Sequence, residues 1–498
     1  MGEVVAQHDL VLRNGRVIDP ASGLDGVRDV GVMGGRVSAV SEAPLSGRTT
    51  VEASGKVVCP GFIDLHSHGQ QIPEQRFQAL DGVTTALELE AGARPVAAAY
   101  RRAAAEGRPI NYGYSSSWAL ARMEVLAGYR PRGEANEAVT RLGDEAWRRV
   151  ATPGQVDAIL ALIGADLAAG ALGIGILVGY APAVEPAEYV QVAALAAARG
   201  VPTYTHAREL VENDPATPVD GAEEVARTAG ETGARMHYCH LNSTSTRHVA
   251  RVLALIERVR AAGATVTTEA YPYGTAMTAI GAAFLAPEHL HRRNLTPASI
   301  TYLPTMRRLA DEAELRALRR ADPGGLAFIT YLADDVPAEF SYVEAALAFP
   351  GAAVASDGLP FHWPGQPPEP HAWPLPPGAV GHPRSVGTFS RVLRLAREGA
   401  LFGLPEAVAR LTLAPARVLE ASCGAAGAKG RLTVGADADL TVFDPEVVSD
   451  RATYTDPVRA STGIDQVLVG GTFVVRDGDL VPDALPGRPL HAGGPPPR

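Results

Sequence analysis

Pro60-Gly61-Phe62-Ile63-Asp64-Leu65-His66-Ser67-His68 combines a turn, a short apolar run and two histidines that lie two positions apart. Because side chains alternate between the two faces of a strand, His66 and His68 should project to the same side. Two imidazoles placed in this way at the end of a strand can bind one metal ion. The segment therefore predicts a buried strand that carries part of a metal site, provided that further ligands follow.

Three more candidate ligands follow, and each stands at the end of its own apolar run: His206, His240 and Asp357. A lone histidine is most simply explained as a structural residue, but four histidines and one aspartate at the ends of four separate runs are hard to assign to chance. Four imidazoles and one carboxylate suit Zn²⁺ or a similar borderline ion. We therefore expect a zinc site.

The middle of the chain, from about residue 58 to about 414, alternates strand-like runs with alanine-rich helical segments. The strand candidates are residues 61–68, 84–90, 110–115, 172–178, 201–206, 235–240, 264–270 and 352–357. Eight strands alternating with helices indicate an α/β protein with a (β/α)₈ barrel, whose site should lie at the carboxyl ends of the strands. The gap between the seventh and eighth strands is too long for one helix, so an insertion is expected at about 275–345.

Both ends of the chain have a different texture, with short strand-like runs separated by Asn-Gly and Gly-Gly turns. Residues 1–57 and 415–480 are therefore expected to form one small β-sandwich beside the barrel. Residues 481–498 contain Pro-Gly and Pro-Pro-Pro and predict a flexible tail.

The charge and composition of the chain argue against some classes of binding partner. The net charge is −10, the charged content is 20%, and no basic block occurs, which argues against nucleic acid or an anionic membrane. No uncharged apolar run is long enough for a membrane span, and the first residues lack the features of a secretory signal. Three widely spaced cysteines do not form a disulfide framework. We expect a cytoplasmic protein that acts on a small molecule, with a homo-oligomer as one option for its assembly.

The ligand pattern resembles the amidohydrolase superfamily, and most closely its N-acyl-D-amino-acid deacylase (D-aminoacylase) branch. The resemblance covers nearly the whole chain. It rests jointly on residues 60–68, Gly82-Val83-Thr84-Thr85, Thr205-His206-Ala207-Arg208, Cys239-His240-Leu241, Ala270-Tyr271-Pro272-Tyr273, Ser356-Asp357-Gly358-Leu359-Pro360 and the run from His382-Pro383-Arg384 to Phe389. In that superfamily the strand-one pair, the histidines of strands five and six and the strand-eight aspartate bind one or two metal ions.

One departure from the family concerns the ligand shared by two metals. Many relatives use a carbamylated lysine, but this chain has no lysine between Lys56 and Lys429. The deacylase branch uses a cysteine on strand two, where this chain has Ala91. Glu88 and Glu90 end the same buried run, and a metal partner would explain two carboxylates there. Glu90 lies nearer the strand end and is favoured as the ligand. Glu88 is the alternative, and ion pairs with arginine would explain both without a metal.

A second departure concerns the substrate. The resemblance implies that a substrate carboxylate is held by a lysine two residues after the strand-six histidine, a tyrosine after strand seven and the arginine of His-Pro-Arg. Tyr273 and Arg384 match the last two, whereas Asn242 stands in place of the lysine. Arg208 completes the candidate substrate-binding residues. An asparagine offers dipoles only, so binding of an anionic substrate is expected to be weaker but retained.

The leading hypothesis is hydrolysis of a non-peptide amide bond, most simply deacylation of an N-acyl-D-amino acid. A metal-activated water would attack, and Asp357 would act as general base and then as general acid. A cyclic amide or imide hydrolase, or a non-hydrolytic biosynthetic enzyme on the same barrel, is the alternative. A non-catalytic scaffold is a lesser one.

Several other polar residues are expected to lie outside the site. His289 and His291 fall in a charged stretch of the insertion and should face solvent. Strand alternation places His237 and Cys239 on the face opposite to that of His240, so both are expected to point away from the metal.

Overall fold

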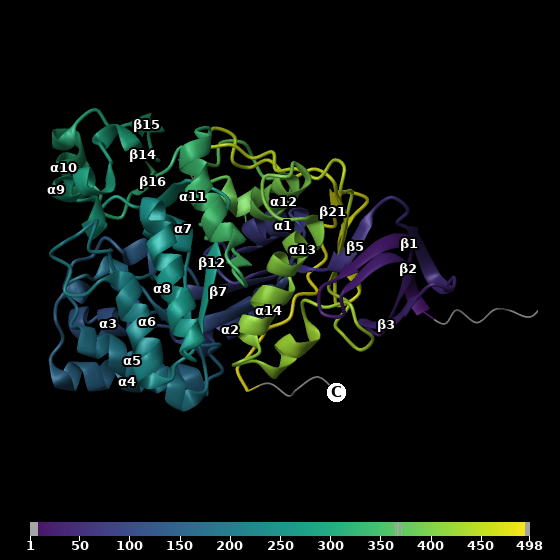
Figure 1. The fold of residues 1–498 in the computed structure, drawn as a ribbon, viewed down its shortest axis with the longest axis horizontal. Coiled ribbons are helices and arrows are strands. Elements are labelled where there is room, and N and C mark those ends of the chain that lie inside the picture. Colours follow the sequence, from purple (N-terminus) through teal and green to yellow (C-terminus); the bar gives the residue numbers. More distant parts are fainter. Residues whose placement is uncertain (1–7, 364, 366–367, 370, 494–498) are drawn as a thin grey trace, which may run out of the picture.

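The computed structural model of the chain describes residues 8–363, 365, 368–369 and 371–493. Within these residues the strands form three sheets, of eight, nine and four strands. Figure 1 shows the eight-stranded sheet at the centre, the nine-stranded sheet at the end of the molecule that carries β1–β3, and the four-stranded sheet at the upper corner of the opposite end.

The eight-stranded sheet is the predicted barrel, and all its strand pairs are parallel. In chain order the strands are β6 (Phe62–Asp64), β7 (Val83–Ala93), β8 (Asn111–Ser117), β9 (Ile174–Ile176), β10 (Thr203–Thr205), β11 (Met236–Tyr238), β12 (Val266–Ala270) and β17 (Ala353–Val354). The edges β6 and β17 meet through a parallel bridge between Ser67 and Gly358 and a hydrogen bond from the Asp357 N–H to the His66 carbonyl. The barrel is therefore closed at the end where the predicted ligands lie.

Helices cover the outside of the barrel, and Figure 1 shows α3–α6 and α8 along one flank. The helices are α1 (Ile72–Leu80), α2 (Val96–Glu106), α3 (Trp118–Ala127), α4 (Pro153–Ala168), α5 (Pro186–Arg199), α6 (Gly221–Thr232), α7 (Leu241–Ser245), α8 (Val249–Ala261), α11 (Pro337–Ala348), α12 (Arg384–Arg397), α13 (Leu404–Leu411) and α14 (Leu413–Leu419). Proline at the first positions of α1, α4, α5 and α11 starts these helices without the loss of a hydrogen bond.

The chain between β12 and β17 contains the expected insertion. It forms an antiparallel sheet of β13 (Thr275–Ala279), β14 (Ile300–Tyr302), β15 (Arg307–Arg308) and β16 (Leu326–Thr330), with the helices α9 (Pro287–Leu290) and α10 (Glu312–Ala321). After this sheet the chain returns to the barrel, where α11 packs against α8 and β12.

Strands from both ends of the chain share the nine-stranded sheet, as predicted. They are β1 (His8–Asp19), β2 (Leu24–Met33), β3 (Arg36–Ser41), β4 (Gly47–Glu52), β5 (Val57–Pro60), β18 (Leu440–Phe443), β19 (Ile464–Val469), β20 (Thr472–Arg476) and β21 (Asp479–Leu480). The central contact is β5 against β18, which joins the two ends of the chain. Their apolar side chains form a buried cluster separate from that of the barrel.

The predicted flexible tail requires correction for residues 481–493, whereas residues 494–498 lie outside the described part of the chain. Backbone hydrogen bonds connect Arg488 and Leu490 to Tyr112 of β8, and the Leu490 side chain is buried beside Leu172 and Leu87 inside the barrel. This segment, residues 487–493, is called the C-terminal strap below. Its proline and glycine content predicted disorder, but its backbone groups find partners on a distant part of the chain.

No helix within the described residues is long and apolar enough to cross a membrane.

Candidate metal centre and active site

Six side chains meet at the carboxyl end of the barrel, and five different strands position them. They are His66 and His68 after β6, Glu90 near the end of β7, His206 after β10, His240 after β11 and Asp357 after β17. Five of the six are buried, and His206 is partly exposed. The five ligands predicted on strands one, five, six and eight are therefore brought together, and Glu90 joins them.

The carboxylate of Glu90 lies between two pairs of histidines. Its Oε2 is 3.2 Å from His66 Nε2 and 3.8 Å from His68 Nε2. Its Oε1 is 2.7 Å from His240 Nε2 and 3.2 Å from His206 Nδ1. One carboxylate oxygen thus faces each pair, which divides the cluster into two halves that share Glu90.

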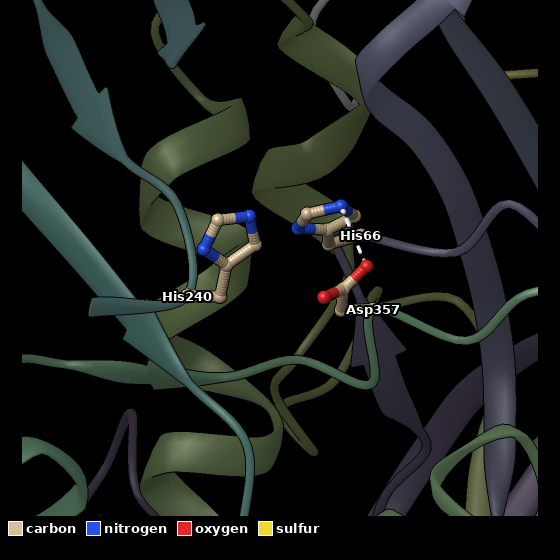
Figure 2. A group of neighbouring side chains, drawn as sticks. All are labelled: His66, His240 and Asp357. Carbon is tan, nitrogen blue, oxygen red and sulfur yellow. Dashed lines mark ion pairs between the residues drawn. The ribbon is translucent and has the colours of Figure 1, made fainter. Parts of the chain in front are cut away.

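Asp357 lies beside the strand-one histidines, as Figure 2 shows for His66. Its Oδ1 is 3.4 Å from Nε2 of both His66 and His68, and its Oδ2 is 2.9 Å from a terminal nitrogen of Arg384. The backbone of Asp357 has φ +49°, and that of His240 has φ +30°. Such left-handed conformations are costly for residues other than glycine and are concentrated at functional sites.

The electrostatics of the centre favour ionised carboxylates. Burial opposes charge on Asp357, but Arg384 and His66 outweigh it and hold the pKa of Asp357 well below its usual range. Burial also opposes charge on Glu90, yet its three nearest histidines, His66, His240 and His206, keep its pKa well below the ordinary value. Two ionised carboxylates among imidazoles form a donor set that suits a divalent cation.

The donor atoms are also close enough to share ions. Within the described residues, His66, His68 and Glu90 form one group whose ligand atoms all lie within 4.8 Å of one another, and Glu90, His206 and His240 form another. His66, His240 and Asp357 form a third such group. Nitrogen and oxygen donors spaced in this way fit the usual zinc coordination distances of about 2.0–2.2 Å.

Glu88, the alternative ligand, lies behind His68 and not among the ligand atoms. Its Oε2 is 2.7 Å from His68 Nδ1, and its Oε1 accepts the backbone N–H groups of Ala91 and Gly92. Both oxygens therefore have partners. The third explanation, pairing of both glutamates with arginine, is wrong for these two carboxylates, because histidines and backbone amides surround them.

A cavity opens above five of the six side chains, all except His66. Its remaining walls come largely from the loop after α3, from the loop after β9 and from the insertion: Val139, Leu142, Leu177, Tyr180, Ala276, Met277, Thr278, Phe284, Arg293, Tyr331 and Leu359. Most of these side chains are apolar or aromatic, as is usual for a small-molecule site. The cation among them, Arg293, is held by both oxygens of Glu209.

The four predicted substrate-binding residues have different surroundings. Arg384 contacts Asp357, and its Nε and second terminal nitrogen have no hydrogen-bond partner within the described chain. Tyr273 is buried under Arg391 and does not line the cavity. The side-chain amide of Asn242 binds the backbone of Tyr271 and Tyr273.

Arg208 is unsuited to the predicted role of binding substrate. Its guanidinium donates to Glu224 and to the carbonyls of Pro182 and Val184, and it is fully buried away from the cavity. Asn242, Tyr273 and Arg208 therefore stabilise the loops around the site, and Arg384 alone of the four reaches the cluster of six side chains.

The expectation that Cys239 points away from the metal is wrong, whereas His237 contacts Glu269 and belongs to no candidate ligand group of the described residues. His237 Nε2 is 3.1 Å from Glu269 Oε2, and Cys239 lies within 4.8 Å of His66 and Glu269. Regular alternation ends with β11 at Tyr238, and the left-handed backbone of His240 turns its side chain back to the interior. In the insertion, His291 is exposed as expected, whereas His289 is only partly exposed.

Two residues of the centre were absent from the sequence prediction. Glu269 lies near the end of the seventh strand and is buried. Burying a carboxylate is costly, so the signal that indicated Glu90 could also have indicated Glu269. Arg293 follows the charged stretch of the insertion, and no periodic pattern marks it as part of a cavity.

Comparison with known proteins agrees with this geometry. Residues 49–475 match the sequence profile of the amidohydrolase family. The chain is 32% identical to an N-acyl-D-glutamate deacylase of Alcaligenes xylosoxydans xylosoxydans over 97% of this chain and 96% of the relative. The chain thus belongs to the amidohydrolase family, whose members are metal-dependent hydrolases.

Two solved structures match almost the whole chain. An N-acyl-D-glutamate deacylase of Bordetella bronchiseptica, in complex with zinc and a phosphonate mimic of the tetrahedral intermediate, has a TM-score of 0.75 and 28% identity and covers 97% of this chain and 100% of its own. A D-aminoacylase with a binuclear metal centre has a TM-score of 0.74 and 25% identity, with the same coverage.

Proposed function

We propose that this chain binds one or two zinc ions through His66, His68, Glu90, His206, His240 and Asp357 and hydrolyses N-acyl-D-amino acids. The observation that carries the proposal is the position of Glu90, because its two oxygens face two separate pairs of histidines. Ala91 cannot provide the cysteine ligand of the related branch, and no lysine is available for carbamylation. The Glu90 carboxylate would serve as the shared ligand in place of the cysteine or the carbamylated lysine.

Asp357 performs the proton transfers of the reaction. When bound, the cation supplies an activated water and polarises the amide carbonyl. Asp357 accepts the proton of the attacking water and then delivers it to the departing amide nitrogen. Arg384 holds Oδ2, so Oδ1 remains directed at His66 and His68, where the water must be activated.

An acidic N-acyl-D-amino acid is the substrate class that we favour, with Arg384, which contacts Asp357 but does not line the cavity, as the candidate group for a carboxylate. Arg384 retains two unpartnered nitrogens beside the catalytic aspartate, and a guanidinium is well shaped for a carboxylate. Arg293 in the cavity wall is already paired with Glu209, so Arg384 carries the proposed contact. The relative with 32% identity acts on N-acyl-D-glutamate, which has two carboxylates. We also propose a cytoplasmic location, which the three free cysteines favour.

A substrate panel tests the proposal. The zinc-loaded chain is assayed for amino-acid release from N-acetyl-D-glutamate, N-acetyl-D-leucine and N-acetyl-L-glutamate, and for opening of a cyclic imide. The expected result is fastest release of D-glutamate, with Asp357→Asn as the inactive control. Opening of the cyclic imide alone would assign the chain to the alternative class, and a zinc-loaded chain that acts on none of these compounds would contradict the proposal.

A further inference from the structure

A chain of buried polar side chains runs from the metal centre into the barrel wall. Glu269 Oε1 is 2.5 Å from His66 Nδ1, and Glu269 Oε2 is 3.1 Å from His237 Nε2. His237 Nδ1 in turn lies 2.8 Å from the hydroxyl of Thr267. His66, His237 and Glu269 are each at most 1% exposed, so bulk water does not replace these contacts.

We propose that Glu269 is a positioning residue that orients His66 for metal binding and strengthens the affinity of the centre for its cation. The inference rests on the proposed metal site and concerns a residue that does not itself bind the ion. His66 is the ligand that Glu269 acts through, and His237 holds Glu269 in place.

The directions of the hydrogen bonds fix the protonation of His66. An ionised carboxylate only accepts hydrogen bonds, so His66 must carry its proton on Nδ1 and His237 must carry one on Nε2. His237 Nδ1 then accepts from Thr267, whose alternative acceptor, the Met236 carbonyl, is farther away at 3.4 Å. In the neutral imidazole that a cation would bind, Nε2 is then the nitrogen without a proton, and it is directed at Glu90 and Asp357. This is the nitrogen that a metal ligand requires, and a carboxylate behind a ligating histidine commonly serves this purpose.

A rival explanation would place a further cation among His66, Cys239 and Glu269, whose donor atoms also lie close together. The partners of Glu269 oppose it, because Oε1 already faces His66 Nδ1 at 2.5 Å and Oε2 faces His237 Nε2 at 3.1 Å. His66 would also have to bind this ion through Nδ1, although its Nε2 faces the ligands Glu90 and Asp357. The contact is therefore a hydrogen bond.

The test compares zinc affinities of the full chain by competition with a chromogenic chelator. Glu269→Gln keeps an acceptor for His66 but removes the charge, and Glu269→Ala removes both. We expect affinity for the zinc held by His66 to fall about 10-fold in the first variant and about 100-fold in the second. The matched control is Glu188→Gln, which alters a buried carboxylate paired with Arg122 and Trp118 away from the centre. It should lower the melting temperature and leave zinc affinity unchanged.

The outcomes separate this inference from the function on which it rests. A wild-type chain that binds no zinc would remove the proposed function. If the wild type binds zinc and Glu269→Gln binds it with equal affinity, the role of Glu269 is overturned while the proposed function stands. Because glutamine has nearly the shape of glutamate, this variant should remain folded even if Glu269→Ala does not. Cys239→Ala should keep the zinc stoichiometry, whereas loss of one bound ion would assign that trio as a metal site instead.

Discussion

Glu90 presents one carboxylate oxygen to His66 and His68 and the other to His206 and His240. A carboxylate buried among four imidazoles is costly unless it is compensated, and a cation on each side provides that compensation. Glu88 stands two residues earlier on the same strand, but both its oxygens are already hydrogen-bonded. The two glutamates therefore have separate tasks, and substitution should distinguish them.

Replacement of Glu90 by alanine should lower the number of tightly bound zinc ions and reduce turnover, because both halves of the centre lose a ligand. Elemental analysis after dialysis measures the stoichiometry. In the matched variant Glu88→Gln the bound zinc should persist with weaker affinity, because His68 loses only a charged partner. Equal zinc content in wild type and Glu90→Ala would refute the ligand role of Glu90.

Replacement of Asp357 by asparagine should lower kcat by about 10²–10⁴-fold, the usual contribution of a general acid or base. Zinc should remain bound, since four histidines and Glu90 are retained. Steady-state assays of the zinc-loaded variant measure the effect. Near-normal turnover would show that another group moves the proton.

At the scale of elements, the barrel strands determine which side chains meet. The apolar runs before His206, His240 and Asp357 predicted β10, β11 and β17 and the end of the barrel where the site lies. Strand alternation does not predict side-chain directions where the backbone departs from an ideal strand, as at His240 with its left-handed backbone. The cavity wall could not be predicted either, because Arg293 and Tyr331 come from an irregular insertion without periodic signals.

Strand β9 must approach β7 closely, and a glycine makes this possible. A Cβ atom on Gly175 would lie 2.2 Å from the carbonyl oxygen of Glu90. Gly175→Ala should therefore displace the backbone of Glu90, weaken zinc binding and lower the free energy of unfolding by about 1–3 kcal/mol. The control Gly154→Ala, at a helical position with open space around it, should be neutral or slightly stabilising. Denaturant unfolding and zinc competition measure both effects, and similar behaviour of the two variants would contradict the packing argument.

Helix α1 carries a carboxyl group whose ionisation should make stability depend on pH. Burial raises the pKa of Glu74 from 4.5 to about 7 in the folded chain. The folded state then holds the proton more tightly than the unfolded state, so this contribution to stability is fully present below pH 4.5 and is lost as pH rises through about 7. Relative to Glu74→Gln, the wild type should lose up to about 1.4 kcal/mol per pH unit across that window. Unfolding of both metal-free proteins at several pH values measures this difference, and a constant difference would be contrary evidence.

At the scale of the whole molecule, segments from distant parts of the sequence complete the barrel. The C-terminal strap pairs with β8 at the amino end of the barrel, where Leu490 fills space beside Leu87 and Leu172. These contacts leave no local pattern in the sequence, which explains why composition alone predicted a tail. Pairing of β5 with β18 was easier to anticipate, because both ends of the chain carry strand-like runs.

Leu490→Ala should lower the free energy of unfolding by about 2–5 kcal/mol, the usual range for a leucine truncated in a core. Val434→Ala serves as the control, because Val434 is 67% exposed and should be nearly neutral. Urea unfolding measures both. A neutral Leu490→Ala variant would mean that the strap does not contribute to the core of the barrel.

The most direct test of the proposed metal centre is the location of the bound cations. Anomalous diffraction at the zinc edge, from crystals of the zinc-loaded chain, would locate each ion relative to Glu90. We predict a peak bound by His66, His68 and Glu90 and, where a second ion is present, one bound by His206, His240 and the other oxygen of Glu90. A peak among His66, Cys239 and Glu269, or zinc bound only away from Glu90, would contradict the proposed centre.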